Sequence, residues 1–533
     1  METTASIHNF MFKRDNLIHQ LKNNQNWDVI IIGGGATGLG VALDCTTRGY
    51  KTLLLEQVDF AKGTSSRSTK LVHGGVRYLA QGNIDLVREA LYERGLLLKN
   101  ASHLVSSQSF IIPNYKWWDN FFYAAGLKVY DLLSGKLSFG NSVRIKRQET
   151  ISRLSTLKTD KLKGGVVYYD GQFDDSRLAV NIAQSCIENG ATVLNHFKVK
   201  NLLKNENGVV NGVVAIDTES ETEYRLNAKA VINATGVFTD EVLKMDDATA
   251  KNLIRPSQGI HLVFDKSYLP GNDAIMIPKT NDGRVLFLVP WHDKVVVGTT
   301  DTMLNSSSLE PKPLDKEVDF IIDTANRYLN RTVSKDDVLS IFAGLRPLAA
   351  PNDKSEKTKE ISRSHKIIVS DSELITITGG KWTTYRRMAQ DTVNKMIELN
   401  KVPNAKCKTK NLLIHGANGI VDRSSHLYIY GTDRIEIESI IKEDPSLGEL
   451  LHPRLQFTKA EIVFAARNEM ARTIEDVLAR RVRVLFLDAK AAIEIAPMVG
   501  ELLRKELNER EEWRGQQISE FIAVADQYVL KSN

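Results

Sequence analysis

The sequence predicts a multidomain α/β protein that combines a parallel β-α-β unit, an antiparallel β domain and a helical C-terminal domain. Three observations predict this class. A glycine-rich turn at 33–38 joins an apolar run to a helix-like run, β-rich runs separated by turn residues fill 255–300, and apolar residues recur at helical spacing from about residue 400 onward. The 533 residues, 42% of them hydrophobic, are enough for about two or three domains with sizeable cores.

Charge and cysteine content argue against several protein classes. The 70 basic and 65 acidic residues nearly cancel, so the net charge of +5 gives little support to nucleic-acid binding, although a mildly basic surface suits anionic substrates or lipids. Cys45, Cys186 and Cys407 are far apart, so we expect neither a disulfide framework nor a metal site. No segment reaches the roughly 20 apolar residues that cross a bilayer, so we do not expect an integral membrane protein.

Residues 1–26 precede the first glycine-rich unit. They lack the apolar core of a signal peptide and the arginine-rich, acid-poor character of an organelle transit peptide. We therefore expect a bacterial-type N-terminal extension that is partly helical.

The stretch "DVIIIGGGATGLGVALDCTTRGYKTLLLE" predicts a complete β-α-β unit. The apolar run at 29–32 predicts a buried parallel strand, and "KTLLLE" predicts a second one. In the G-x-G-x-x-G spacing, Gly33 makes a tight turn, Gly35 lets the backbone approach a pyrophosphate, and Gly38 lets the helix pack on the strand. Glu56, eighteen residues after Gly38, is placed to bind ribose hydroxyls. The unit predicts dinucleotide binding, with an ordinary glycine-rich turn as the alternative.

Two later strand-to-glycine turns fit the same domain. "INATG" follows a predicted strand at 230–232, and "TGGKWTTYR" follows another strand and opens a helix near Thr383. A helix start at the second turn offers its amides to cofactor atoms. For the first turn taken by itself, an ordinary strand-to-loop glycine is the alternative.

Other stretches predict the rest of the fold. We interpret Asp174, Asp175 and Arg177, in "FDDSRLAV", as helix capping and surface charge rather than a catalytic cluster. The runs "GIHLVF", "RVLFLVPW" and "KVVVGTTD" predict an antiparallel sheet that is the natural candidate for a substrate domain. In the C-terminal part, an apolar helical stripe over 462–478 predicts packing surface, and Pro497 is expected to interrupt a further helix.

Taken in order, "IIGGGATGLG", "TSSRSTKLVHGGVRYL", "YYDGQFDD", "INATG", "IHLVF", "VGTTD", "GLRPL" and "TGGKWTTYR" closely resemble the FAD-dependent, aerobic and quinone-linked glycerol-3-phosphate dehydrogenases. The resemblance runs from about Asp28 to the C-terminus, and the N-terminal extension departs from it. It implies a glutathione-reductase-like FAD-binding Rossmann domain. It also implies oxidation of sn-glycerol 3-phosphate to dihydroxyacetone phosphate by hydride transfer to flavin N5, with electrons passed to membrane quinone.

Together with the predicted elements, the resemblance divides the chain into four parts. Residues 1–26 are the extension, and 27–112, 165–243 and 341–398 form a discontinuous FAD-binding domain. Residues 113–164 and 244–340 form a substrate or cap domain with a membrane-facing segment. Residues 399–533 form the helical C-terminal domain.

The resemblance also implies which residues contact FAD. They are Gly33, Gly35, Gly38, Glu56, Thr64, Ser65, Ser66, Lys70, Leu71, His73, Gly74, Gly75, Ala234, Gly236, Gly344, Gly380, Lys381 and Thr383. In "HGGVRYL" it implies that Gly74 and Gly75 let the backbone pass close to the isoalloxazine ring. The alternative is a helix-start turn, which explains the glycines only if another element crowds them.

On the substrate side, the resemblance implies four cations and a tyrosine. They are Arg77, Tyr78, Arg346, Arg363 and Lys381. A phosphorylated polyol dianion needs fixed positive groups, and the planar, permanently charged guanidinium suits it. For any one of these cations the alternative is an ordinary surface charge, which fits Arg346 least because its surroundings are apolar and glycine-rich.

His261, in "GIHLVF", is the expected catalytic base, with Arg77 and Arg346 as the other catalytic residues. An imidazole that titrates near neutrality is suited to accept the proton of a hydroxyl group. A lone histidine in a strand is otherwise usually structural, so this role depends on the resemblance. Whether His261 is the base or only orients the hydroxyl stays open.

The stretch "YKWWDNFFYAAGLKVYDLLSGK" is unusually aromatic and basic. Its aromatic residues are Trp117, Trp118, Phe121, Phe122, Tyr123 and Tyr130, among Lys116, Lys128 and Lys136. This mix is typical of a helix lying in a lipid interface, and the alternative is a patch buried against another domain or a homodimer partner. Because the resembled family delivers electrons to membrane quinone, we expect a cytoplasmic protein that is peripheral on the cytoplasmic membrane.

Two other functions stay open at this point. A glycerol-3-phosphate oxidase using O₂, or another FAD-dependent amine or 2-hydroxy-acid oxidoreductase, would keep the fold, and a flavin-holding interaction module would keep only the binding. The insertion typical of the oxidases is not seen here, and a carboxylate substrate would need fewer cations than this chain supplies.

Overall fold

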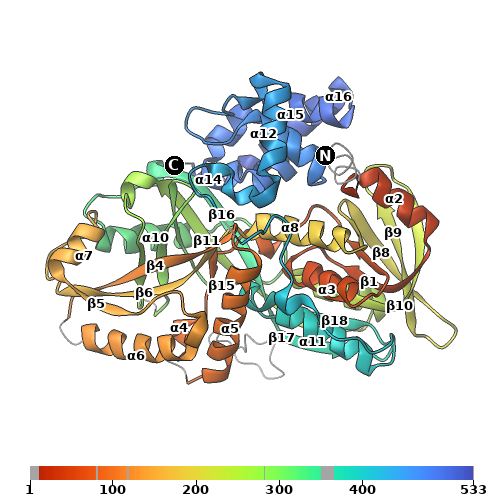
Figure 1. Cartoon of the computed structure of the whole chain (residues 1–533), viewed down its shortest axis with the longest axis horizontal. Helices are drawn as coiled ribbons and strands as arrows, with labels where there is room; N and C mark the ends of the chain where they lie inside the picture. The colour runs from red at the N-terminus through yellow and green to blue at the C-terminus, as the bar shows by residue number, and fades with distance from the viewer. Residues whose placement is uncertain are drawn as a thin grey trace.

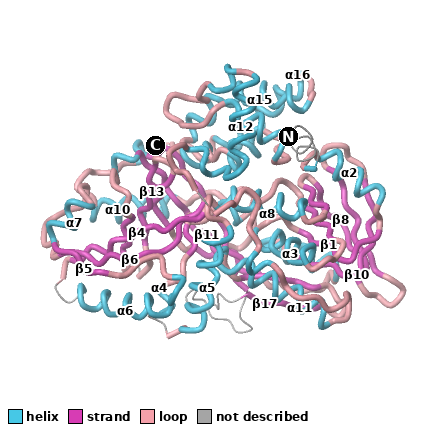
Figure 2. Tube along the Cα trace, viewed as in Figure 1, coloured by secondary structure: helices cyan, strands magenta, loops and turns pink. Residues whose placement is uncertain are grey.

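Two β-sheet regions lie side by side, and a helical C-terminal domain is seated above their junction (Figure 1). The computed structural model describes residues 11–79, 82–116, 119–280, 283–349, 365–419 and 421–531. Strands of the two sheets converge near the middle of the molecule (Figure 2).

The first sheet is the parallel sheet that the glycine-rich unit predicts. Its main path runs β17-β18-β10-β1-β2-β7, and the β8–β9 hairpin extends from β10. The strands are β1 (Asn26–Ile32), β2 (Thr52–Leu55), β7 (Thr192–Leu194), β8 (Phe197–Lys204), β9 (Val210–Asp217), β10 (Glu223–Asn233), β17 (His365–Val369) and β18 (Ile375–Gly379). Helices α3 (Ala36–Thr47), α8 (Asp175–Glu188) and α11 (Tyr385–Glu398) pack around it. β2 is buried throughout, as expected for a helix-covered parallel strand.

The second sheet is largely antiparallel, which confirms the prediction for 255–300. Its path runs β15-β11-β14-β13-β12-β4-β6-β3, with β16 paired to β11 and β5 to β6. The strands are β3 (Leu71–Val72), β4 (Val105–Asn114), β5 (Val143–Lys146), β6 (Gly164–Phe173), β11 (Ile254–Asp265), β12 (Ala274–Ile277), β13 (Leu286–Trp291), β14 (Lys294–Gly298), β15 (Thr302–Met303) and β16 (Val338–Ala349). A separate apolar core fills the space between this sheet and α10 (Asp315–Tyr328).

The strand pairing differs from the expected division of the chain in three segments. We assigned 105–112, 165–173 and 341–349 to the FAD-binding domain, but β4, β6 and β16 all pair within the second sheet. The apolar pattern of a single strand does not reveal its pairing partner, so the pattern alone does not assign it to a sheet. The domain boundaries themselves stay a prediction.

The remaining helices before the C-terminal domain surround both sheets. They are α2 (Arg14–Asn23), α4 (Val76–Leu79), α5 (Ile84–Asn100), α6 (Asp119–Ser134), α7 (Arg147–Arg153) and α9 (Thr239–Asp246). Helix α2 confirms that the N-terminal extension is partly helical. Leu17 and Leu21 are fully buried in the core of the first sheet, and Arg14 pairs with Asp217 on β9 at 2.7 Å.

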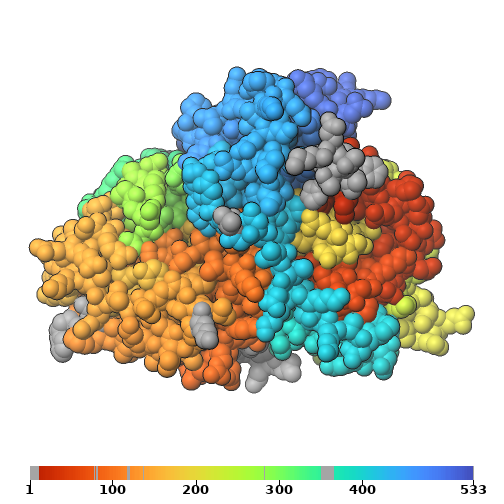
Figure 3. Space-filling model, in the orientation of Figure 1, coloured from red at the N-terminus to blue at the C-terminus, as the bar shows by residue number. Residues whose placement is uncertain are grey.

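The C-terminal domain is helical, as predicted, and lies across the line where the two sheet regions meet (Figure 3). Its elements are α12 (Arg434–Glu443), α13 (Lys459–Asn468), a π-helical turn (Asp476–Arg481), α14 (Val484–Leu487), α15 (Ala489–Leu507) and α16 (Glu511–Ala525). Pro497 does not interrupt α15, so that expectation is wrong. The buried face of α15 around Ile495, Ala496 and Val499 keeps the helix continuous although the proline removes one backbone donor.

Candidate active site

The glycine-rich turn sits at the carboxyl end of β1, where the backbone leaves no room for side chains. Gly33 has φ 107°, and a Cβ there would lie 2.8 Å from the carbonyl oxygen of Ala234. A Cβ on Gly38 would overlap the carbonyl oxygen of Gly33. Each glycine is therefore required sterically, and the N-terminus of α3 is brought against β1 and β10, as the G-x-G-x-x-G spacing predicts.

Replacing Gly38 by alanine is expected to abolish FAD retention, because the methyl group has to displace the turn that receives the pyrophosphate. The measurement is the flavin-to-protein absorbance ratio of the purified variant. Gly515→Ala is the matched control, since a Cβ there meets nothing within 4 Å. A Gly38→Ala protein with its full flavin content would contradict this account of the turn.

Glu56 lies at the end of β2, half-buried beside the glycine turn. Its carboxylate accepts hydrogen bonds from the amides of Gly34 at 2.6 Å and Val58 at 3.0 Å. Burial raises the pKa of Glu56 above its ordinary value, and the two amide donors oppose that shift. The side chain thus fixes the glycine loop in addition to lining the cleft where the ribose is expected.

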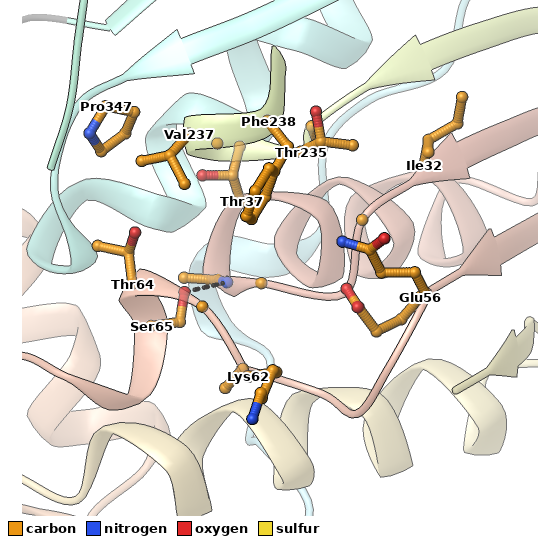
Figure 4. Close-up of a pocket in the computed structure, with 18 of the residues that line it drawn as sticks. Ile32, Thr37, Glu56, Lys62, Thr64, Ser65, Thr235, Val237, Phe238 and Pro347 are labelled. Atoms are coloured by element: carbon orange, nitrogen blue, oxygen red, sulfur yellow. Dashed lines mark hydrogen bonds between the residues drawn. The ribbon is translucent and has the colours of Figure 1, made fainter. Parts of the chain in front are cut away.

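A cleft of about 1250 Å³, including its open mouth, extends from this turn along the first sheet. Thr64 and Ser65 lie on one side of it, Val237 and Pro347 on another, and Glu56 at one end (Figure 4). Ser65 accepts a hydrogen bond from the amide of Ala36, at the start of α3, at 2.9 Å. Ala234 and Gly236, from the "INATG" turn, also line the cleft. Glycine walls and a helix N-terminus fit the dinucleotide part of FAD.

A second cavity of about 1140 Å³ adjoins the first. Residues that line both are Thr64, Pro347, Gly379, Gly380, Lys381 and Trp382. His261, Gly344 and Arg346 face this second cavity from β11 and β16 of the other sheet, and Leu71, His73 and Thr383 also line it. The structure thus brings His261, Arg346 and Lys381 together next to the dinucleotide cleft. This is the arrangement expected for a flavin ring with a substrate beside it.

His261 is 2% exposed, and its ring stacks on Phe342 with centroids 4.9 Å apart. Its Nε2 lies 2.9 Å from the hydroxyl of Thr69, which also lines the cavity. Burial, together with the positive charges of Lys70 and Arg346, holds the pKa of His261 well below its ordinary value. The imidazole is therefore neutral near pH 7, which is the form that accepts a proton.

Arg346 is held by the turn that follows β14. Its Nη2 donates to the hydroxyl of Thr299 at 3.2 Å and to the carbonyl of Thr300 at 3.1 Å, and Nη1 lies 3.6 Å from a carboxylate oxygen of Asp301. A Cβ on Gly259 would clash with the guanidinium, so this glycine makes room for it. The side chain is 27% exposed, so it is partly desolvated and faces the cavity.

In the "HGGVRYL" segment, crowding by neighbouring side chains explains why the first glycine, Gly74, is needed. Proximity to a flavin is not required to explain it. A Cβ on Gly74 would lie 2.5 Å from Leu91 and 2.6 Å from the hydroxyl of Tyr130, and that hydroxyl accepts a hydrogen bond from the Gly74 amide. Packing of α5 and α6 therefore crowds this position. Gly75 has φ 80°, which favours glycine independently. Contact of either glycine with the cofactor stays a prediction.

Lys70, which was expected to contact FAD, lines neither of the two cavities. Its ammonium is fully buried, 2.8 Å from Asp175 and 2.7 Å from the carbonyl of Ser66, and it lies over the rings of Trp291, Phe342 and Phe486. Burial and the nearby Arg483 lower the pKa of Lys70 to about 7. The Lys70 side chain therefore supports the loop behind the second cavity. The motif does not reveal this orientation of the side chain.

Asp174 caps α8, as predicted, accepting a hydrogen bond from the amide of Arg177 at 3.1 Å. The expectation of surface charge is wrong, because Asp174, Asp175 and Arg177 are all at most 3% exposed. Arg177 pairs with Glu469 of the C-terminal domain at 2.5 Å. The sequence pattern of a capped helix does not show what covers the helix.

Three expected substrate residues lie beyond what the structure describes. Arg363 falls in 350–364, outside the described residues, and the side chains of Arg77 and Tyr78, on α4, are not described either. Several residues that line the second cavity were missed, and two of them, Thr69 and Trp382, make informative contacts. Thr69 contacts His261, and Trp382 donates from Nε1 to the carbonyl of Ser65 at 2.8 Å. Both stand in the motifs quoted above, but neither carries a charge that would have drawn attention.

Comparisons with known proteins agree with this geometry. Residues 28–386 match the family model described as FAD dependent oxidoreductase, and residues 371–514 match the C-terminal domain of alpha-glycerophosphate oxidase. The chain is 42% identical over 526 residues to a Caenorhabditis elegans protein named probable glycerol-3-phosphate dehydrogenase, mitochondrial, with 93% of this chain and 72% of that protein covered. It is 39% identical over 525 residues to the Homo sapiens protein named glycerol-3-phosphate dehydrogenase, mitochondrial, with 92% and 71% covered.

The solved structures include one of the same overall architecture. The glycerol-3-phosphate dehydrogenase from Bacillus halodurans, complexed with FAD, superimposes with a TM-score of 0.80 at 28% identity and covers 97% of this chain and 98% of its own. The predicted fold class, an FAD-binding Rossmann domain with a second β domain and a helical C-terminal domain, is confirmed.

Proposed function

Because the chain belongs to the family of FAD-dependent glycerol-3-phosphate dehydrogenases, we propose that it oxidises the C2 hydroxyl of sn-glycerol 3-phosphate and releases dihydroxyacetone phosphate. FAD is the cofactor, and when bound it supplies the two-electron acceptor that amino-acid side chains lack. The glycine turn, Glu56 and Ser65 would hold its dinucleotide part, and residues shared by the two cavities, such as Lys381 and Trp382, would adjoin its ring.

Arg346 and Lys381 supply positive charge for the phosphate dianion. Both line the second cavity, and Arg346 is oriented by Thr299 and Thr300 before any ligand arrives. A preorganised guanidinium loses little freedom on binding an oxyanion. Arg77 and Arg363 are proposed to complete this cation set, as the resemblance implies.

His261 is proposed to accept the proton of the C2 hydroxyl at Nε2. With its own proton on Nδ1, the neutral ring presents Nε2 as an acceptor on the side of Thr69, which lines the cavity. Stacking on Phe342 keeps the ring in one plane. The substrate proton thus moves to Nε2 while Arg346 holds the phosphate in the same cavity.

One observation carries the proposal. A neutral histidine and an arginine face a single cavity that is continuous with a dinucleotide cleft. The test is formation of dihydroxyacetone phosphate from sn-glycerol 3-phosphate with an artificial electron acceptor, with glycerol and a 2-hydroxy acid as comparison substrates. Turnover of the 2-hydroxy acid but not of the phosphate ester would overturn the proposal.

We propose membrane quinone as the electron acceptor and a peripheral position on the cytoplasmic membrane. On α6, Phe121, Phe122, Val129 and Leu132 are 58%, 70%, 47% and 80% exposed. Arg144 lies over the ring of Phe121, 4.6 Å from its centroid, so cationic and apolar groups share this surface. An exposed apolar face edged by cations suits a lipid interface. Among the described residues, no helix combines the length and apolar character needed to cross a bilayer.

The double variant Phe122→Ser/Leu132→Ser is expected to weaken binding to anionic lipid vesicles about a hundredfold or more, since each side chain loses roughly 1.5–3 kcal/mol of apolar transfer. Vesicle co-sedimentation measures this. Ile435→Ser, which removes a 70% exposed apolar side chain from α12, is the control and should bind like the unmodified protein. Equal loss in both variants would argue against a membrane-specific surface on α6.

The acceptor is tested separately. The proposal predicts efficient reduction of a soluble quinone analogue and little peroxide in air. Stoichiometric peroxide with no quinone reduction would replace quinone by O₂ as the acceptor while leaving the substrate assignment unchanged.

A further inference from the structure

The segment between β2 and β3, residues 56–70, lines both cavities. We call it the β2–β3 connection. Glu56, Thr64 and Ser65 face the dinucleotide cleft, and Arg67 and Thr69 face the cavity that holds His261. Its conformation therefore determines where FAD binds and how Thr69 meets the histidine.

The far side of this connection is held by the C-terminal domain. The carboxylate of Asp59 accepts a hydrogen bond from Nε of Arg480 at 2.5 Å. It also accepts hydrogen bonds from both terminal nitrogens of Arg481, at 2.8 and 3.0 Å. Lys62 lines the cleft, but its side chain extends away from the other labelled residues (Figure 4) and pairs with Glu475 at 2.5 Å. Two residues of the connection are thus joined to three side chains of one short segment.

A third contact extends this set. The carbonyl of Ser66 accepts a hydrogen bond from Arg483 at 3.0 Å, and Arg483 also binds Asp175, the partner of Lys70. The side chains of Asp59, Arg481 and Arg483 are 0% exposed and that of Arg480 is 2% exposed. In such a dry environment charge-assisted hydrogen bonds are strong and strongly orienting.

The backbone that presents these arginines is unusual. Arg480 and Arg481 lie on a π-helical turn (Asp476–Arg481), and Arg483 adopts a left-handed conformation with φ 62°. Adjacent residues of a regular helix point about 100° apart, yet here both guanidinium groups reach one carboxylate. π-helical turns and left-handed non-glycine residues persist where the surroundings or a function require them.

We propose that Arg480 and Arg481 are positioning residues for FAD, which they serve by clamping Asp59 so that the β2–β3 connection keeps its cofactor-binding shape. The C-terminal helical domain is then part of the cofactor site although it contributes no lining residue to either cavity among the described residues. The inference rests on FAD binding by the chain and not on the identity of the substrate.

The competing explanation is that these pairs only attach one domain to another. The chain offers a matched comparison in Arg48, which pairs with Asp44 at 2.5 Å and has a side chain that is 1% exposed. That arginine also donates to Asn394 on α11 and to the carbonyl of Ala405, both at 2.9 Å, and none of these residues belongs to the β2–β3 connection or lines either cavity. Its loss should lower stability without releasing FAD.

The experiment compares holoenzymes of Asp59→Asn/Arg481→Gln, Glu475→Gln and Asp44→Asn/Arg48→Gln. The first variant neutralises Asp59 together with Arg481, because removing one of them alone leaves a buried charge unpaired, and Arg480 keeps Glu475 and Asp476 as partners. FAD release is followed as the rise in free-flavin fluorescence after dilution, hydrogen exchange is measured for residues 57–69, and Tm is measured for each variant.

We expect Asp59→Asn/Arg481→Gln to release FAD roughly tenfold faster or more, with faster exchange in 57–69. Glu475→Gln should shift both in the same direction by less, and Asp44→Asn/Arg48→Gln should shift only Tm. Release at the wild-type rate from folded Asp59→Asn/Arg481→Gln protein would overturn the proposal. If that variant does not fold, unchanged release and exchange in Glu475→Gln would overturn it.

Discussion

Replacing His261 by asparagine is expected to lower kcat for sn-glycerol 3-phosphate by about 10²- to 10⁴-fold, the range typical of a lost general base. Asparagine keeps a hydrogen-bonding group beside Thr69 but does not accept the proton. FAD content should be unchanged, because the neighbours of His261 are Thr69 and Phe342 rather than the dinucleotide cleft. The measurement is steady-state turnover with an artificial acceptor.

His452→Asn is the control for this variant. His452 lies in the C-terminal domain, where it pairs with Glu494 at 2.9 Å, so its replacement should leave kcat as in the unmodified protein. If His261→Asn retains near-normal kcat with raised KM, His261 orients the hydroxyl and another group takes the proton. That outcome would settle the alternative left open by the sequence.

The pH dependence follows from the same environment. The pKa of His261 lies well below the ordinary histidine value of 6.5, so protonation removes the base only at more acidic pH. The acid limb of kcat/KM should therefore fall below pH 6.5, with activity rising as pH increases through the depressed pKa. Removing the nearby charge of Arg346 should raise the pKa of His261 and move this limb to higher pH.

Arg346→Ala is expected to raise KM for the phosphate ester strongly and to cost about 2–4 kcal/mol of transition-state binding, or roughly 30- to 1000-fold in kcat/KM. The side chain is the structurally best-defined cation in the second cavity, already oriented by Thr299 and Thr300. A partly buried guanidinium that pairs with a dianion is difficult for solvent to replace. Flavin content is measured in parallel.

Two further variants serve as comparisons for Arg346→Ala. Arg346→Lys should recover part of the loss, since a lysine restores the charge but not the planar fork. Arg255→Ala removes an exposed arginine from the neighbouring strand β11 and should leave KM unchanged. Loss of flavin from Arg346→Ala would show instead that the arginine supports the cofactor.

The parts of the site that could be predicted from sequence are those determined by local sterics. Gly33 and Gly38 have no room for a Cβ, and that requirement is visible in the spacing because the strand, turn and helix are consecutive. His261 and Arg346 were expected only through the family resemblance. Nothing in "GIHLVF" or "GLRPL" shows that β11 and β16 pair and point both side chains into one cavity.

The burial of several charged side chains could not be predicted from the sequence. Asp174, Asp175 and Arg177 have polar side chains in a helix-capping pattern, which is typical of exposed positions, yet the C-terminal domain covers them. Whether a charged residue is solvated or paired depends on a segment about three hundred residues away in the chain, such as Glu469 or Arg483. Local patterns carry no information about that distant partner.

The most direct test of the central claim, that one cavity joins a flavin site to a base and a phosphate-binding cation, is anaerobic titration of the purified flavoprotein. We predict that sn-glycerol 3-phosphate bleaches the visible flavin absorbance at one equivalent per bound FAD, whereas glycerol at the same concentration leaves it unchanged. An unchanged spectrum after sn-glycerol 3-phosphate, or equal bleaching by glycerol, would contradict the account.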